Sequence, residues 1–70
     1  MKKEIKIKIN GKLNIIGDKT KLSVLIKKLK IPLSKVAIEL NKEIMDKKKL
    51  HKIYLKKNDK IEIVHFIGGG

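Results

Sequence analysis

The residues with the clearest chemical potential are the three glycines that end the sequence, Gly68, Gly69 and Gly70. Glycine has no Cβ, so a glycine segment can pass through a channel too narrow for other residues and adopt backbone angles that they avoid. Its terminal carboxylate is the least hindered one that a polypeptide offers. Such a carboxylate can attack the α-phosphate of a nucleotide to give an acyl adenylate, which sulfur or another nucleophile then displaces. The alternative interpretation is a frayed chain end, because chain ends are commonly disordered.

The other side chains with catalytic potential are scattered along the sequence. They are His51, His65, Asp18, Asp59, Glu62, Ser23 and Ser34. The histidines are accompanied by no cysteine and form no helical pair, so the sequence predicts no metal site. The serines lack the context of a nucleophile elbow, and the glycines at positions 11 and 17 do not belong to a phosphate-binding loop. We therefore expect a protein that binds no cofactor and is not an enzyme on its own.

The sequence has 70 residues and a formal net charge of +12, and all 19 of its basic residues are lysines. A chain of this length has room for one domain with a single small core. Strong positive charge suggests nucleic-acid binding, but the arginine fork that reads phosphates and guanines is missing. The only aromatic residues are Tyr54 and Phe66, too few for a base-stacking platform. We expect a solvated lysine surface that binds polyanions weakly, with a small basic nucleic-acid-binding domain as the remote alternative.

Cysteine is absent, which removes disulfides and thiolate chemistry from consideration. The basic N-terminus leads into alternating residues rather than an apolar run, so it does not resemble a signal peptide. No stretch of the sequence approaches the length needed to span a membrane. A cytoplasmic protein without membrane contact, monomeric when free, is the expectation.

Alternation of apolar and polar residues predicts a β-hairpin at the start of the chain. Residues 5–9 alternate isoleucine with polar side chains, and residues 13–15 resume the alternation. Asn10-Gly11 stands between them, and this pair favours a type I′ turn because both positions need a positive φ.

The period then changes to that of a helix. Leucine and isoleucine at positions 22, 25, 26 and 29 form one apolar stripe of about eleven helical residues. Thr20 is the expected N-cap, because its hydroxyl can accept from a free N–H of the first turn. Pro32 is expected to end the helix, since it cannot donate a hydrogen bond and restricts the residue before it.

The second half of the chain reads as strands again. Residues 36–40 alternate, 44–45 form a short apolar return, and 46–50 predict one helical or 3₁₀ turn with Asp46 as its cap. Residues 51–55 are weakly strand-like, and residues 60–66 form the last strong strand.

This order of elements predicts an α+β protein with the β-grasp (ubiquitin-like) fold. A mixed sheet of four to five strands has one main helix packed across one face, which satisfies every apolar stripe at once. The final strand can enter the middle of the sheet beside the first. We expect a β-grasp domain over residues 1–67 and a flexible glycine tail over residues 68–70.

Two segments carry a resemblance to a known family. They are Val36-Ala37-Ile38-Glu39-Leu40-Asn41 with Lys42-Glu43-Ile44 after it, and residues 58–70, which read NDKIEIVHFIGGG. The chain resembles the ThiS family, the sulfur carriers of thiamine biosynthesis, over nearly its whole length, and the last thirteen residues are the most specific part. Ile31-Pro32-Leu33 departs from the family, which commonly has a glycine after the helix, and the lysine excess is unusual.

The resemblance implies a reaction cycle at the Gly70 carboxylate. An E1-like adenylating enzyme of the ThiF type would activate it with ATP and magnesium, both belonging to that partner. A persulfide from a cysteine desulfurase system would convert it to a thiocarboxylate. A thiazole synthase of the ThiG type would accept the sulfur while building the thiazole ring. Carriers for molybdopterin synthesis or tRNA thiolation resemble the chain in fold and terminus, and they are the alternative functions.

Ordering the tail in a partner costs backbone entropy of roughly 1–2 kcal/mol for each glycine, so the domain must dock as well. If residues 61 and 63 face the helix, Val64 and Phe66 point to the opposite sheet face, together with Ala37 and Glu39. We therefore expect Phe66, Val64 and Ile67 to dock the partner, with Gly68 and Gly69 as the tether to Gly70.

Overall fold

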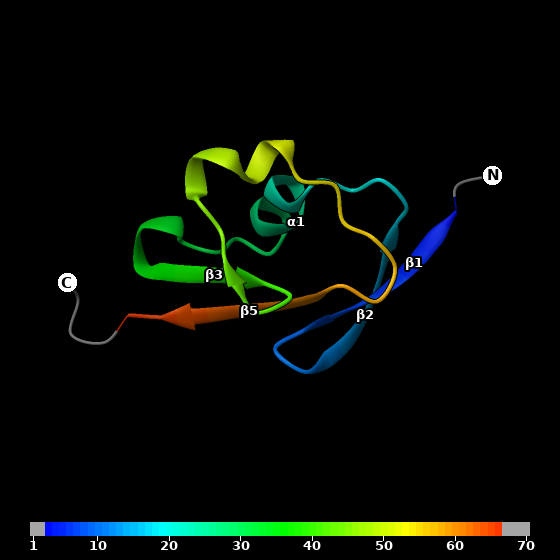
Figure 1. The fold of residues 1–70 in the computed structure, drawn as a ribbon, viewed down its shortest axis with the longest axis horizontal. Coiled ribbons are helices and arrows are strands. Elements are labelled where there is room, and N and C mark those ends of the chain that lie inside the picture. The colour runs from blue at the N-terminus through cyan, green and yellow to red at the C-terminus, as the bar shows by residue number, and fades with distance from the viewer. Residues whose placement is uncertain (1–2, 67–70) are drawn as a thin grey trace.

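The computed structural model describes residues 3–66, and these form a sheet with helical segments over one face (Figure 1). The strands are β1 (Glu4–Ile9), β2 (Lys12–Gly17), β3 (Val36–Leu40), β4 (Glu43–Ile44) and β5 (Lys60–His65). The helical segments are α1 (Leu22–Lys28), η1 (Leu33–Lys35) and η2 (Lys47–Lys52), the last two being 3₁₀ helices. The expected boundary between a domain of residues 1–67 and a tail of residues 68–70 lies outside the described residues.

The strands form one mixed sheet in the order β2-β1-β5-β3-β4. β5 pairs parallel with β1 and antiparallel with β3, so the last strand occupies the centre of the sheet. This arrangement is the predicted β-grasp fold, and its central last strand is held by neighbours on both sides. In Figure 1, β5 runs toward the end of the molecule opposite the start of β1.

The core lies between the sheet and the helical segments. Its buried members are Ile7, Leu22, Leu25, Ile26, Val36, Ile38, Leu50, Leu55, Ile61 and Ile63. Every strand residue in this set belongs to one alternating stripe of β1, β3 or β5, and α1 contributes three residues at helical spacing. The period-two and period-3.6 patterns of the sequence therefore meet in one core, as predicted.

The hairpin departs from the expectation at one point, the orientation of β2. Asn10 and Gly11 have φ values of 49° and 81°, as a type I′ turn requires. The resulting register places Leu13 opposite Lys8 and Ile15 opposite Lys6, so both apolar residues share the solvated face of those lysines. Leu13 is 59% and Ile15 58% exposed. The prediction that one helix covers every apolar stripe is therefore wrong for β2.

The helix is shorter than predicted at both ends. Its N-cap position is Lys21, because the Thr20 hydroxyl donates instead to the carbonyl of Gly17, 2.6 Å away. Leu29 is the C-cap and is exposed rather than part of the buried stripe. The segment at 51–55 is also less strand-like than expected, since its only bridge in the described chain joins Tyr54 to Lys21.

A Schellman motif ends the helix before Pro32 is reached, contrary to the prediction. The amide of Ile31 donates to Ile26 O (3.2 Å), and that of Lys30 donates to Lys27 O (3.0 Å). Lys30 has a φ of 57°, the left-handed conformation that this motif requires and that glycine adopts without a steric penalty. A lysine thus occupies a position whose backbone conformation favours glycine.

Replacing Lys30 by glycine is expected to stabilise the domain by about 0.5–1 kcal/mol. The left-handed conformation costs a non-glycine residue roughly 1–2 kcal/mol, and glycine avoids this cost. Part of the gain is lost because glycine has more conformational entropy in the unfolded chain. Urea titration of Lys30→Gly against the parent measures the change. Lys28→Gly is the matched control and is expected to destabilise by about 1 kcal/mol, because position 28 lies within α1. Equal changes in stability for both variants would contradict the left-handed conformation of Lys30.

Candidate functional site

The end of β5 is the described part of the chain nearest to the glycine tail. Ile61 and Ile63 point into the core, whereas Val64 is 50% and Phe66 52% exposed. The register pairs Val64 with Ala37, which lies on the same sheet face. The sequence-based expectation for the orientation of β5 is therefore confirmed. Ile67, Gly68, Gly69 and Gly70 lie outside the described residues.

Phe66 is held by two contacts from different elements. Its amide donates to Lys35 O (2.9 Å), which continues the pairing between β5 and β3 by one residue. The ammonium of Lys47 lies 5.5 Å from the centre of its ring, within the range of a cation–π interaction. Phe66 thus stays at a defined position at the end of the sheet while half of its surface remains available to a partner.

No element of residues 3–66 covers the sheet face opposite the helical segments, and we call it the open face. It is formed by Lys6, Lys8, Leu13, Ile15, Ala37, Glu39, Ile44, Lys60, Glu62 and Val64. Two like-charged pairs stand directly across from each other on it, Lys8 with Lys60 and Glu39 with Glu62. Such pairs disfavour sheet formation. The open face therefore carries charges of both signs with apolar residues between them.

Two asparagines hold β5 in place, a role that was not predicted for either from the sequence. The Asn10 side chain accepts from the amide of Ile63 at 2.7 Å and donates to its carbonyl at 3.4 Å. The Asn41 side chain accepts from the amide of Lys60 at 2.9 Å and donates to Asp59 at 3.0 Å. Both asparagines have positive φ values, 49° and 51°. The side chains of both turn residues therefore hydrogen-bond to the backbone of β5, as a neighbouring strand would.

The other polar candidates are placed apart. His51 belongs to η2, whereas His65 ends β5 opposite Val36. Asp59 serves its own turn, where its carboxylate accepts from the amide of Lys56 at 2.7 Å. Within residues 3–66 the structure contains no group of three or more potential metal ligands. In the same part of the chain no helix is long and apolar enough to cross a membrane.

Comparisons with known proteins agree on one family. The ThiS family model matches residues 4–70. The sulfur carrier protein ThiS of Bacillus subtilis is 54% identical over 35 residues, which cover 50% of this chain and 53% of that protein. The crystal structure of the thiamine biosynthesis protein ThiS from Geobacter metallireducens superimposes with a TM-score of 0.83 at 26% identity, covering 94% of this chain and 100% of that one.

A further relative is a much longer protein. The thiazole synthase of Magnetococcus marinus is 38% identical over 66 residues, which are 94% of this chain but only 20% of that enzyme. A segment similar to this chain is therefore part of a polypeptide named as a thiazole synthase.

Proposed function

Because this chain belongs to the ThiS family, we propose that it is a sulfur carrier protein of thiamine biosynthesis whose Gly70 carboxylate is converted to a thiocarboxylate. The observation that supports this most directly is the end of the central strand. β5 is fixed on both sides and leads through the half-exposed Phe66 into Ile67 and three glycines. A rigid scaffold followed by a thin tether is what delivery of a carboxylate into another protein requires.

The chemistry proceeds in two displacements, the first at the α-phosphorus of ATP and the second at the carboxyl carbon of Gly70. A carboxylate oxygen of Gly70 attacks the α-phosphorus of ATP, pyrophosphate leaves, and an acyl adenylate forms. The outer sulfur of the donor persulfide then attacks the acyl carbon, and AMP leaves with one carboxylate oxygen. A thiol of the donor system next attacks the donor sulfur of the resulting acyl disulfide, which breaks the S–S bond, forms a donor disulfide and releases the thiocarboxylate. The chain contributes the reacting carboxylate and its position, since effective concentration at a fixed geometry is the main gain that a carrier provides.

The partners follow from these steps. An E1-like adenylating enzyme supplies the nucleotide site with ATP and magnesium, and a cysteine desulfurase system supplies the sulfur. A thiazole synthase accepts it, which is supported by the Magnetococcus thiazole synthase that includes a segment similar to this chain. These relatives favour the thiamine pathway over carriers for molybdopterin synthesis or tRNA thiolation. We assign the carrier to the cytoplasm as a free monomer.

The test of this function is the intact mass of the chain after reaction. The protein is incubated with its cognate adenylating enzyme, ATP, magnesium and a sulfur donor, and the mass is compared with a sample lacking ATP. The expected result is a gain equal to the exchange of one oxygen for one sulfur. A mass that stays unchanged while the enzyme adenylates a known carrier would contradict the proposal.

Docking is assigned to Phe66, Val64 and Ile67, next to the tether. Replacing Phe66 by alanine is expected to raise the KM for the carrier in adenylation by about ten- to thirtyfold, because aromatic anchors carry much of the energy of an interface. The kcat is expected to change little, since Gly70 and its tether stay intact.

Tyr54→Ala is the matched control for Phe66→Ala. Tyr54 is 53% exposed and has a lysine ammonium 5.5 Å from its ring, as Phe66 does, but its backbone pairs with Lys21 and not with the segment before β3. The control is expected to leave the KM within about twofold of the parent, as surface substitutions outside an interface do. An equal rise in KM for both variants would remove Phe66 from the docking site.

A further inference from the structure

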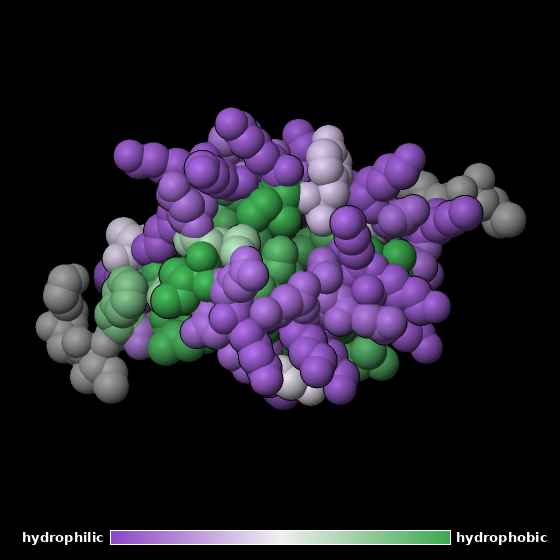
Figure 2. Space-filling model, in the orientation of Figure 1, coloured by the Kyte–Doolittle hydropathy of each residue, from purple (hydrophilic) through white to green (hydrophobic). Residues whose placement is uncertain are grey.

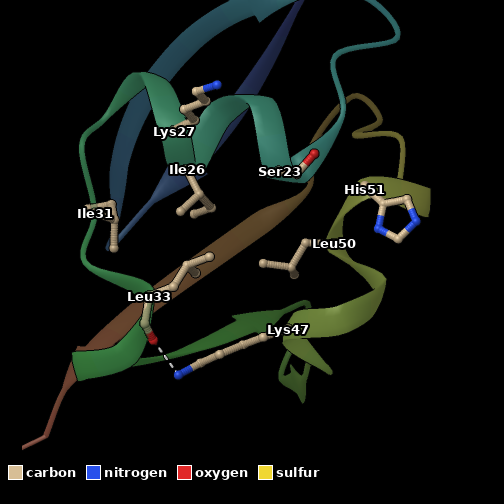
Figure 3. A pocket seen from close by; sticks show the side chains of 8 residues that line it. All are labelled: Ser23, Ile26, Lys27, Ile31, Leu33, Lys47, Leu50 and His51. Atoms are coloured by element: carbon tan, nitrogen blue, oxygen red, sulfur yellow. Dashed lines mark hydrogen bonds between the residues drawn. The ribbon is translucent and has the colours of Figure 1, made fainter.

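A groove lies between α1, η1 and η2, on the side of the molecule away from the open face. It has a volume of about 380 Å³ and is lined chiefly by Ile26, Lys27, Ile31, Leu33, Lys47 and Leu50 (Figure 3). Figure 3 shows Ile26 and Leu50 pointing into this space from α1 and η2. Ile26 and Leu50 belong to the buried core, whereas Leu33 is exposed, so the groove has an apolar floor and an apolar wall open to solvent.

The rim of the groove carries positive charge only. The two lysines of the lining, Lys27 and Lys47, are exposed, and the lining includes no acidic residue. In Figure 2 hydrophilic side chains cover most of the visible face, and hydrophobic surface shows between them in the region of α1 and β3. Apolar surface framed by cations is complementary to an apolar side chain flanked by carboxylates.

Lys47 connects this groove to the end of β5. Its ammonium donates to the carbonyl of Leu33 in the groove wall and also lies over the ring of Phe66. An ammonium has three donors, so one bond to Leu33 leaves donors for an incoming carboxylate. Lys47 is therefore shared between the groove and Phe66, the residue next to the tail.

We propose that this groove is a second docking site for the adenylating enzyme, and that it takes an apolar side chain with adjacent carboxylates from an acidic segment of that enzyme. The inference rests on the proposed carrier function. The activating enzyme must capture the free domain from solution and release it after each turnover. Attraction between clustered lysines and an acidic segment raises the encounter rate, and the apolar floor adds a contact that charge alone does not provide.

The apolar part of this proposal is tested with Leu33→Ser. The expected result is a rise of about fivefold or more in the KM for the carrier during adenylation, with an unchanged kcat, because a well-packed apolar contact is lost at the interface. Leu13→Ser is the control, since Leu13 is also an exposed leucine but lies on the open face at the far edge strand. Thermal unfolding of both variants verifies that they fold.

The charged part is tested with Lys27→Glu against Lys28→Glu. Both lysines are in the last turn of α1, so both substitutions change the net charge and the helix-end electrostatics alike. Lys27 lines the groove, whereas Lys28 lines a separate depression beside β2. The expected result is a KM raised about fivefold or more by Lys27→Glu only, and a salt dependence that is weaker in this variant.

Each other outcome overturns the inference. If Leu33→Ser behaves as Leu13→Ser does, the groove is not an adenylation interface. If Lys27→Glu and Lys28→Glu have equal effects, general attraction of the lysine surface is sufficient. If the variants impair only sulfur delivery to thiazole synthase, that enzyme is the occupant. Loss of the proposed function itself is distinguishable, because the parent protein would then not be adenylated at all.

Discussion

Removing Gly70 is expected to abolish thiocarboxylation while leaving the folded domain unchanged. The truncated chain still ends in a glycine carboxylate, so the chemistry of the reacting group is the same. Its reach is shorter by one residue, about 3.5 Å. Reacting atoms must approach to about 3–3.5 Å, and misplacement by 1 Å already costs roughly 100-fold in rate. The measured quantity is the fraction of chain that gains sulfur, determined by intact mass after a fixed time.

Two controls separate reach from the other properties of the tail. The described core residues all lie between Ile7 and Ile63, so the urea midpoint of the truncated chain is expected to equal that of the parent. Gly69→Ala keeps the length of the tether and adds one methyl group, so it tests the width of the partner's channel instead. A truncated chain that accepts AMP at the parent rate would contradict the role of Gly70 as the reacting terminus.

The fold was largely predictable because its strands alternate cleanly and its turns use diagnostic residues. The Asn10-Gly11 pair predicted the turn of the first hairpin. The alternation of apolar and polar residues in β5 predicted which of its side chains face the core. The orientation of β2 was also contained in the sequence. A two-residue turn at positions 10 and 11 pairs residue 8 with residue 13, and paired residues share a face. Leu13 must therefore lie beside Lys8, which the alternation of β2 taken alone does not reveal.

The helix end was not predictable in the same way. A lysine in the left-handed conformation is unfavourable in isolation, so local preference gives no reason to place a Schellman motif at Lys30. The motif brings Ile31, the residue after Lys30, into contact with the hydrophobic core, and this contact joins segments that are distant in sequence. Pro32 was the residue in the sequence that predicted the helix end, but α1 already ends at Lys28, with Leu29 as its C-cap.

Part of the candidate site could be predicted from the sequence, and part of it could not. Exposure of Val64 and Phe66 followed from period two within a single strand. The groove and the asparagine contacts could not be derived, because they join residues distant in sequence. Asn10 and Ile63 are 53 residues apart, and Asn41 and Lys60 are 19 apart. Asparagine in a turn usually indicates only a positive φ, and its reach to another strand depends on the tertiary arrangement.

Among the side chains that hydrogen-bond to β5, Asn10 is the one for which we expect a large loss of stability on substitution. β1 pairs directly with β5 through Ile9, and the Asn10 amide donates to Ile61 O at 2.8 Å. Beyond that point the side chain of Asn10 takes the place of the next strand residue and bonds both polar groups of Ile63. Asn10→Ala removes these two bonds and leaves an alanine at a φ of 49°, a left-handed conformation that alanine adopts less readily than asparagine. We expect it to lower the free energy of unfolding by about 2–4 kcal/mol.

Asn10→Gly separates the two contributions to that loss. Glycine accepts the positive φ without a steric penalty, so only the hydrogen bonds are lost and about 2 kcal/mol is expected. Asn14→Ala is the control. Among residues 3–66, the Asn14 side chain bonds the nearby Lys12 carbonyl within the hairpin and no other group, and a loss below about 1 kcal/mol is expected. Urea unfolding measures all three variants.

The same variants connect the strand contact to function through the amide of Ile63. If Asn10 holds the end of β5, hydrogen exchange at Ile63 accelerates in Asn10→Gly by more than the loss of global stability explains, because local opening exposes that amide. The carboxylate is then carried by a strand end that frays, and adenylation is expected to show a higher KM at temperatures where the domain remains folded. If hydrogen exchange at the Ile63 amide in Asn10→Gly accelerates no more than exchange at the core amides, Asn10 contributes only to the turn.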